Sequence, residues 1–484
     1  MIMQNSLITK LPQIAVAGRK EAVKIIERVE CSQGVSLQID EYVQPLMFGN
    51  IVENGAVPVG EWCNRLLYGD NLVLMEALLA GDPATGLLPL KGKIDLIYID
   101  PPYASRSNYL TRCTLPGCKG TFVLEQQAFT DTWEEGMAGY LRMLYPRLLL
   151  MRELLSEKGS LIVHLDWHAA HYVKVLLDDI YGRENFRNEI AWCYGGGGAP
   201  KNTYPKKHDL LLWYTKGSTW TFNRQFRPYT QGTLERGLTA VKGDQYKLRK
   251  EGAGLDDWWA GKDVQKILSP TAYENLKFNT QKPEGLLKRI ISGHSNKGDL
   301  IADFFCGTGT TGAAAEKLGR RWIMADSSKL AFMIAYKRLL AQQSKPFFSQ
   351  SRHDCTYPSC GRLELKKSVV RSSAGMDEIT VELGDYIIPA QVHLPLPVKV
   401  REQIQELITA DPLALIEYWM VDPDYDGKVF HSKWQSCRGQ RGEDLRVDSR
   451  AILLVPKVVG TRKICVKAVD VFGCESMASQ IVSN

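Results

Sequence analysis

The sequence has no long apolar segment. Across its 484 residues, no run approaches the roughly 18 consecutive apolar residues that a membrane-spanning helix needs. The N-terminus, MIMQNSLITKLPQ, lacks a basic head followed by a long apolar stretch. We therefore predict no secretory signal, no membrane partner and a cytoplasmic location. Internal repeats and low-complexity tracts are absent as well.

Dense cysteine clustering is also lacking. The eleven cysteines are scattered and odd in number, which fits a reducing compartment better than a disulfide framework. Two close pairs, Cys113 with Cys118 and Cys355 with Cys360, share the same spacing. Four thiolates from two such loops could hold one structural zinc ion, but unrelated surface or core thiols are the simpler explanation.

The net charge of +6 is too small to identify a partner, but its distribution is uneven. Residues 183–251 contain thirteen Lys or Arg against six Asp or Glu, together with eleven aromatic residues. Basic charge mixed with aromatic rings is typical of a nucleic-acid contact region. A solvated surface segment remains an alternative on composition alone.

Strand and helix patterns alternate along most of the chain. The sequence predicts a helical pattern after the turn at residues 69–71, then a strand ending at Asp100, and a second such unit after Pro283. This alternation predicts an α/β fold with a largely parallel sheet. The tail after Met376 changes to short alternating runs that predict a small all-β domain, with one helix near residues 400–409.

The first strand ends in an unusual way, with Asp100-Pro101-Pro102-Tyr103. Two prolines fix an extended backbone and remove two N–H donors, so only acceptors face a pocket: the Asp100 carboxylate and the Pro101 carbonyl. Two acceptors can hold the hydrogens of an exocyclic amino group and make its lone pair available. Tyr103 adds a flat face on which an extruded base can stack.

A second strand end carries Asp303-Phe304-Phe305-Cys306-Gly307-Thr308-Gly309 and runs into a helix. Glycines allow close approach of a ligand to the backbone, and the helix N-terminus offers free N–H groups. Asp326 ends the next strand, where an acid can accept hydrogen bonds from ribose hydroxyls. A tight turn followed by a solvated acid is the alternative explanation.

These motifs resemble those of the DNA amino-methyltransferases that use S-adenosylmethionine. DPPY resembles their catalytic motif, and DFFCGTGTTG with Asp326 resembles their cofactor loop. The stretch at residues 69–72 resembles their upstream motif, and residues 280–283 resemble the start of a cofactor-side helix. DPPY precedes the glycine loop and the basic segment lies between them, which is the order of the β class. That class includes the modification subunits of type III restriction systems.

The resemblance implies a Rossmann-like methyltransferase fold with permuted motif order and a seven-stranded core. It implies that Asp100 and Pro101 polarise the target amine, that Pro102 shapes the loop and that Tyr103 stacks on the base. The implied residues that bind S-adenosylmethionine are Asp70, Asn71, Thr280, Lys282, Asp303, Phe305, Gly307, Gly309, Thr310 and Asp326.

Six segments follow from these assignments. They are an N-terminal lead-in (1–60), the catalytic half of the methyltransferase domain (61–182), a target-recognition insertion (183–275), the cofactor-binding half (276–341), a linker with a cysteine pair (342–375) and a C-terminal β domain (376–484). The C-terminal domain could contact DNA, a second copy in a homodimer or a restriction subunit, and the sequence does not decide between them.

An acid in the first motif position goes with adenine in this family, whereas serine is usual for cytosine amino methylation. We therefore expect methyl transfer to N6 of a flipped adenine in double-stranded DNA. Ring-carbon cytosine methyltransferases need a cysteine after proline, and none of the 22 prolines is followed by one. Cytosine N4, RNA, or a DNA-binding regulator with a degenerate site remain alternatives. Glutamine methyltransferases of release factors use a related motif but place the cofactor loop first.

The run His164-Leu165-Asp166-Trp167-His168-Ala169-Ala170-His171 could be taken for a metal site. Zinc usually takes a fixed set of three or four ligands that are held by further acceptors. The strand-to-helix context favours a pocket wall instead, with Asp166 bordering the base pocket. We predict no catalytic metal.

Overall fold

The computed structural model describes most of the chain. The described residues are 6–45, 61–117, 120–196, 198, 200–237, 248–267, 274–352, 361–373, 375–388, 396–439 and 444–483. Among them, no helix is long and apolar enough to cross a membrane.

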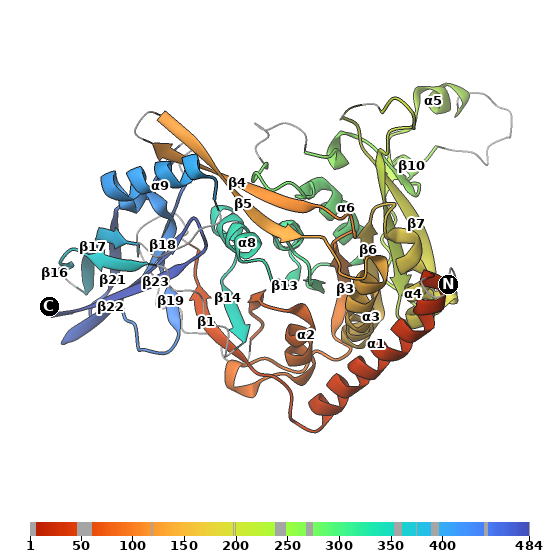
Figure 1. Ribbon diagram of the computed structural model, residues 1–484. Coiled ribbons are helices and arrows are strands. Elements are labelled where there is room, and N and C mark those ends of the chain that lie inside the picture. Colours follow the sequence, from red (N-terminus) through yellow and green to blue (C-terminus); the bar gives the residue numbers. More distant parts are fainter. Residues whose placement is uncertain are drawn as a thin grey trace.

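One large sheet organises the described residues (Figure 1). Its eleven strands, in spatial order, are β11 (Trp258–Trp259), β7 (Phe186–Cys193), β8 (His208–Thr215), β6 (Leu155–Leu165), β3 (Ile94–Ile99), β12 (Leu300–Asp303), β13 (Arg321–Asp326), β2 (Asn64–Tyr68), β14 (Phe347–Arg352), β1 (Leu37–Val43) and β19 (Phe430–Ser432). The six strands from β6 to β14 are parallel to one another, β8 is antiparallel to β6, and β1 is antiparallel to β14.

The main sheet contains more strands than the expected seven-stranded core. Strand β14 lies in the polar segment predicted to be a linker, and strand β1 lies in the predicted lead-in. Strand β14 is buried between β2 and β1, where its backbone completes two ladders. Its sequence, FFSQSR, carries buried polar side chains and therefore lacks the apolar pattern that predicts a central strand.

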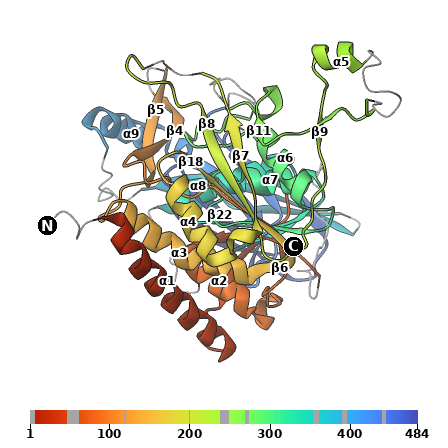
Figure 2. The same cartoon turned by 90° about the vertical axis from the view of Figure 1, so that its right-hand side faces the viewer.

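Helices cover both faces of this sheet, as expected for a Rossmann-like α/β fold. Successive residues along a strand point to opposite faces, so Leu96 packs in one apolar cluster and Ile97 in the other. The helices α1 (Leu7–Glu30), α2 (Asn71–Ala80), α3 (Met137–Leu154) and α4 (Ala170–Tyr181) cover the face of Ile97. The helices α6 (Glu284–His294), α7 (Thr310–Lys317) and α8 (Lys329–Ala341) cover the other. Figure 2 shows α1 to α4 side by side.

Helix α1 is a long element in a segment for which no strong periodicity was expected. Its buried residues are Ile14, Gly18, Ala22 and Ile25, a narrow stripe that contains two small residues. At Gly18 a side chain would clash with the ring of Tyr145 on α3, so the small residue allows the two helices to approach closely. A stripe of this kind gives a weak apolar signal in the sequence.

The predicted insertion contributes β7, β8 and β11 to the main sheet, and the chain between β8 and β11 leaves the sheet. Its outer part contains α5 (Gln231–Gly237) and the short pair β9 (Phe226–Arg227) and β10 (Ala253–Gly254). Helix α5 projects from the body in both views (Figures 1 and 2).

The C-terminal part is a β-sandwich, in agreement with the expected all-β domain. One sheet contains β15 (Arg362–Leu365), β16 (Val369–Ser372), β17 (Met376–Ile387) and β21 (Arg450–Pro456). The other contains β18 (Ile416–Asp422), β20 (Trp434–Cys437), β22 (Thr461–Asp470) and β23 (Glu475–Ser483). Residues of both sheets share one apolar core, and helix α9 spans Val398–Ala410.

Several contacts join the sandwich to the rest of the chain, including ion pairs from β22 to β1 and from α8 to β18. Strand β19 pairs in parallel with β1, which makes it the edge of the main sheet. The hairpin of β4 (Asn108–Gly117) and β5 (Gly120–Thr130) leaves the main body after Asp100 and packs against α9 through Leu115, Phe122 and Leu124. The hairpin is long, and Figure 1 shows it reaching across the molecule toward α9.

Candidate active site

The two unusual strand ends meet at one edge of the sheet. Strands β3 and β12 are neighbours, with Ile97 opposite Ala302, although residues 100–299 lie between the two strands in the sequence. The connection from β3 leads through α3 to β6 on one side, and that from β12 leads through α7 to β13 on the other. This is a topological switch point, where ligands bind in open α/β sheets.

A cavity of ≈ 370 Å³ opens at this point, within the size range of small-molecule sites. It is lined by all but one of the residues predicted from the sequence. These are Asp70, Asn71, Asp100, Pro101, Pro102, Tyr103, Thr280, Lys282, Asp303, Phe305, Gly307, Thr310 and Asp326. The acid–proline loop and the glycine loop therefore face the same space.

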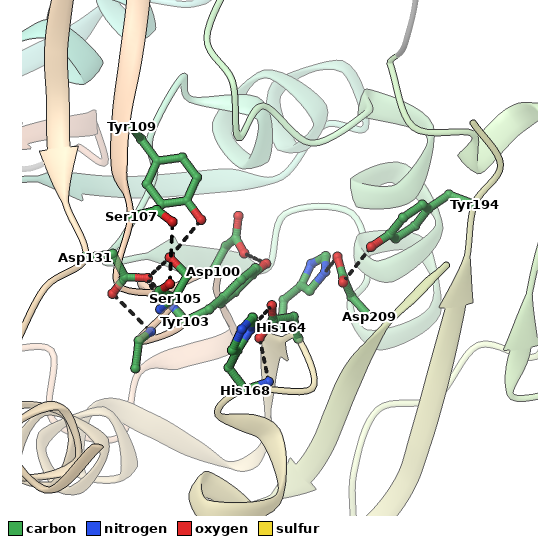
Figure 3. Close-up of polar contacts among 12 residues, drawn as sticks. Asp100, Tyr103, Ser105, Ser107, Tyr109, Asp131, His164, His168, Tyr194 and Asp209 are labelled. Atoms are coloured by element: carbon green, nitrogen blue, oxygen red, sulfur yellow. Dashed lines mark hydrogen bonds and ion pairs between the residues drawn. The ribbon is translucent and has the colours of Figure 1, made fainter. Parts of the chain in front are cut away.

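Both oxygens of the Asp100 carboxylate have partners. The Tyr103 hydroxyl donates to Oδ1, and the Lys282 ammonium donates to Oδ2 (Figure 3 shows the first contact). Asp100 and Lys282 are both mostly buried, at 16% and 11% side-chain exposure. Lys282 also lies 5.5 Å from the centre of the Tyr103 ring. A lysine from the cofactor-side helix start thus contacts the catalytic-motif acid directly.

Glycine is required at the two loop positions for different structural reasons. Gly307 has a φ of +50°, lines the cavity, and a Cβ added to it would meet no atom within 4 Å. Gly309 has a φ of +72°, and its Cβ would lie 2.9 Å from the Cβ of Ala335 on α8. Gly309 is the one predicted site residue that does not line the cavity. Its lack of a side chain instead leaves room for helix α8.

Two buried acids lie beneath the glycine loop. Desolvation raises the pKa of Asp303 to about 7, although the hydroxyl of Thr311 and the N–H of Phe305 donate to its carboxylate. Desolvation also raises the pKa of Asp326. The Asp326 carboxylate accepts hydrogen bonds from the N–H of Gly307 at 2.8 Å and of Ser328 at 2.8 Å. Asp326 therefore fixes the loop that precedes α7.

The start of α2 forms another wall of the cavity. Asp70 caps the helix by accepting from the N–H of Leu72 at 2.9 Å. Arg147 of α3 donates to Asp70 Oδ1 and to Asn71 Oδ1, each at 2.6 Å. Asn71 in turn donates to the carbonyl of Phe304 at 2.7 Å. Arg147 was not singled out in the sequence, because a lone arginine in an amphipathic helix carries no local signal.

Sequence reasoning also missed the wall supplied by the β4–β5 hairpin. Tyr109 and Phe129 stack at 4.7 Å between ring centres, and Phe278 lies 6.5 Å from Phe129. All three line the cavity, as does Asp131. No hairpin was predicted for this stretch, because glycine and proline near the turn break the alternation of apolar and polar residues.

The histidine run does not line this cavity, so a pocket wall with Asp166 at the base pocket stays a prediction. His164 is fully buried, with Nδ1 2.8 Å from the Tyr98 hydroxyl and Nε2 3.2 Å from Asp209 Oδ2. Asp209 also accepts from Tyr194 at 2.9 Å (Figure 3). His164 lies behind Tyr103, with 6.2 Å between the ring centres. His168 is bound separately, to Asp166.

No group of three or more His, Cys, Asp or Glu that could hold a metal is found among the described residues. Of the cysteines proposed to bind zinc, Cys118, Cys355 and Cys360 lie outside the described residues. Cys113 has a free thiol 3.9 Å from Glu417. Zinc binding stays a prediction.

Aromatic and basic side chains gather on the surface of the predicted insertion. The Lys206 ammonium lies 3.3 Å from the centre of the Trp167 ring, and the Arg187 guanidinium lies 3.6 Å from that of Trp220. Tyr204 is 94% exposed. Trp167 precedes the insertion and Arg187 is partly buried, and cation–π pairs of this kind occur on nucleic-acid surfaces.

Residues 94–337 match a protein family described as DNA methylase. The match spans half of the chain and includes both strand ends that line the cavity. The chain belongs to this family of DNA methyltransferases.

Several curated proteins are similar to about half of the chain. Type II methyltransferase M.EcaI of Enterobacter cloacae is 29% identical, and the match covers 55% of this chain and 70% of that protein. Type II methyltransferase M2.DpnII of Streptococcus pneumoniae is 30% identical, covering 51% and 83%. The DNA adenine methyltransferase YhdJ of Escherichia coli (strain K12) is 24% identical, covering 54% and 82%. Two of these names are of type II enzymes, so the resemblance to type III subunits stays a prediction.

Proposed function

We propose that this chain is a site-specific DNA methyltransferase that transfers a methyl group from S-adenosylmethionine to N6 of an adenine flipped out of double-stranded DNA. The observation that carries the proposal is the shared cavity between the acid–proline loop and the glycine loop. Direct transfer requires donor and acceptor in contact, and holding both in one cavity supplies that proximity.

The residues around the glycine loop fit S-adenosylmethionine. Gly307 leaves open space toward the cavity, where a ligand can approach the backbone. Asp326 has lone pairs beyond those used by the loop and can accept from ribose hydroxyls. Asp70 and Asn71 line the opposite wall. When bound, this cofactor supplies a methyl group on a positively charged sulfur atom.

The acceptor side follows from Asp100 and Pro101. An exocyclic amine donates one hydrogen to the Asp100 carboxylate and the other to the Pro101 carbonyl, so that its lone pair is held toward the methyl group. The Tyr103 ring provides a face for the base. The Lys282 contact with Asp100 must be shared or exchanged when the amine arrives, because both carboxylate oxygens already have a partner.

Adenine is supported over cytosine by the acid at position 100, through the family resemblance, and by the name of the Escherichia coli relative. The basic, aromatic insertion supports double-stranded DNA as partner. The names of the type II relatives support a place in restriction–modification.

Transfer of a tritiated methyl group to DNA tests the proposal. We expect the wild-type protein to label DNA, and Asp100→Ala to abolish labelling while DNA binding is retained. Asp385→Ala, an exposed acid on β17 away from the cavity, is the control and should label normally. Hydrolysis of the labelled DNA to nucleosides identifies the base. N6-methyladenine supports the proposal, and N4-methylcytosine would show that the protein is a cytosine-N4 methyltransferase instead. DNA that binds but stays unlabelled would indicate a regulator.

A further inference from the structure

The carboxylate of Asp131 accepts hydrogen bonds from three backbone N–H groups of the catalytic loop. Asp131 follows β5 and is fully buried. Its Oδ2 accepts from the N–H of Tyr103 at 3.0 Å, the N–H of Ser105 at 2.8 Å and the hydroxyl of Ser105 at 2.8 Å. Its Oδ1 accepts from the N–H of Ala104 and from the indole of Trp133, each at 3.0 Å. Figure 3 shows Asp131 directed at this loop.

The loop cannot hold this shape by backbone preference alone. Ala104 and Arg106 have φ values of +58° and +59°, a region that costs a non-glycine residue about 1 kcal/mol. The left-handed Ala104 turns three successive N–H groups toward one point, which forms a binding site for an anion. The Asp131 carboxylate is that anion. Its own backbone also pairs with the loop, through the N–H of Arg106 and the carbonyl of Ser107.

Because of the two prolines, the contact with Asp131 determines how the loop presents its hydrogen-bond acceptors. Pro101 and Pro102 have no N–H, so the first N–H after Asp100 is that of Tyr103, and it donates to Asp131. The proline ring fixes φ at Pro102, which leaves ψ as its one soft dihedral. Fixing the Tyr103 N–H therefore fixes the orientation of the Pro102–Tyr103 peptide, and with it the Tyr103 ring and its hydroxyl contact with Asp100.

We propose that Asp131 is a positioning residue for methyl transfer: its negative charge holds the acid–proline loop in the shape that presents Asp100, Pro101 and Tyr103 to the target base. This rests on the function proposed above and deepens it. Asp131 does not touch the reacting atoms. It acts through the N–H groups of residues 103–105.

The test uses Asp131→Asn in the full-length protein. An asparagine is the same size, but its NH₂ group would face N–H donors on one side, so at least two of the five hydrogen bonds are lost. We expect the amides of residues 103–105 to exchange hydrogen about tenfold faster or more, measured by mass spectrometry on peptides of this loop. We expect kcat for methyl transfer to fall by about 100-fold, the usual effect of a misplacement of about 1 Å, with the Kd for S-adenosylmethionine within about twofold of wild type.

Two control variants separate positioning from a general loss of stability. Asp422→Asn alters another buried acid, which accepts from the N–H groups of Asp424 and His431 in the C-terminal sandwich. It should leave kcat and loop exchange unchanged. Ser105→Ala removes one of the five donors and keeps the three N–H groups, so it should lower kcat by less than about tenfold.

Unchanged loop exchange in Asp131→Asn would overturn the proposal. So would an equal loss of kcat in Asp422→Asn, or a Kd for the cofactor that rises in parallel with the fall in kcat. If the wild-type protein methylates no DNA, the proposed function fails, while the exchange comparison still decides whether Asp131 holds the loop.

Discussion

Replacing each glycine of the loop by alanine should affect a different property of the protein: ligand binding at residue 307 and folding stability at residue 309. In Gly307→Ala the new methyl group enters open space, so the cost to folding is that of a left-handed alanine, about 1 kcal/mol. In Gly309→Ala the same backbone cost is joined by a Cβ 2.9 Å from Ala335 Cβ and 3.2 Å from its Cα. Overpacking of this kind costs about 1–3 kcal/mol, so the total is roughly 2–4 kcal/mol.

Ligand binding should follow the opposite order. Gly307 lines the cavity, and the methyl group of Gly307→Ala would occupy open space there that a ligand close to the backbone needs, so the Kd for S-adenosylmethionine should rise about tenfold or more, or about 1.4 kcal/mol. The folded fraction of Gly309→Ala should bind the cofactor with nearly wild-type affinity, because residue 309 does not line the cavity.

Urea unfolding measures the first effect and isothermal titration calorimetry measures the second. Equal unfolding free energies for the two variants would refute the packing role of Gly309. Wild-type affinity in Gly307→Ala, or loss of binding in well-folded Gly309→Ala, would refute the assignment of the cofactor to the side of the loop that faces the cavity.

Two further predictions concern buried charges. Asp303 releases its proton near pH 3.8 in the unfolded chain but near 7 in the fold, so folding takes up a proton between these values and the free energy of unfolding falls as pH rises through this window. The full difference corresponds to roughly 4 kcal/mol, and Asp303→Asn, which mimics the protonated form, should lose this part of the pH dependence in thermal unfolding; an unchanged profile would contradict the assignment. Lys467 contacts Glu41 and, at 2.9 Å, Glu475, and is 6% exposed. Lys467→Met should lower the free energy of unfolding by about 3–5 kcal/mol, whereas the exposed Lys463→Met should change it little; similar losses in urea titrations of both would refute this.

The sequence predicted the parts of the site that are written as contiguous motifs. Asp100 and Gly307 stand at the ends of apolar strands, and parallel strands in an α/β fold bring such ends to one edge. The strand patterns were enough for these two strand ends, whereas Asp70, Asn71, Thr280 and Lys282 were given only by the family resemblance.

Residues that act from a distance could not be predicted. Asp131 and Arg147 reach the site only through tertiary contacts, and neither stands in a distinctive local pattern. Helix α1 and strand β14 were missed for a related reason. Small or polar residues are buried in them because a neighbouring element packs closely, and the sequence of each element alone does not reveal that neighbour. The roles of Gly307 and Gly309 looked alike in sequence and separate only when Ala335 is seen beside one of them.

The direct pairing of β3 with β12 has an evolutionary consequence. Because Ile97 and Ala302 are held in register by the sheet itself, the outer part of the predicted insertion, which contains α5, is not needed to align them. The entropic cost of closing a connecting loop grows only with the logarithm of its length, each doubling costing about 0.6 kcal/mol. This outer part could therefore be lengthened or shortened between relatives while the strand ends that carry the site stay where they are.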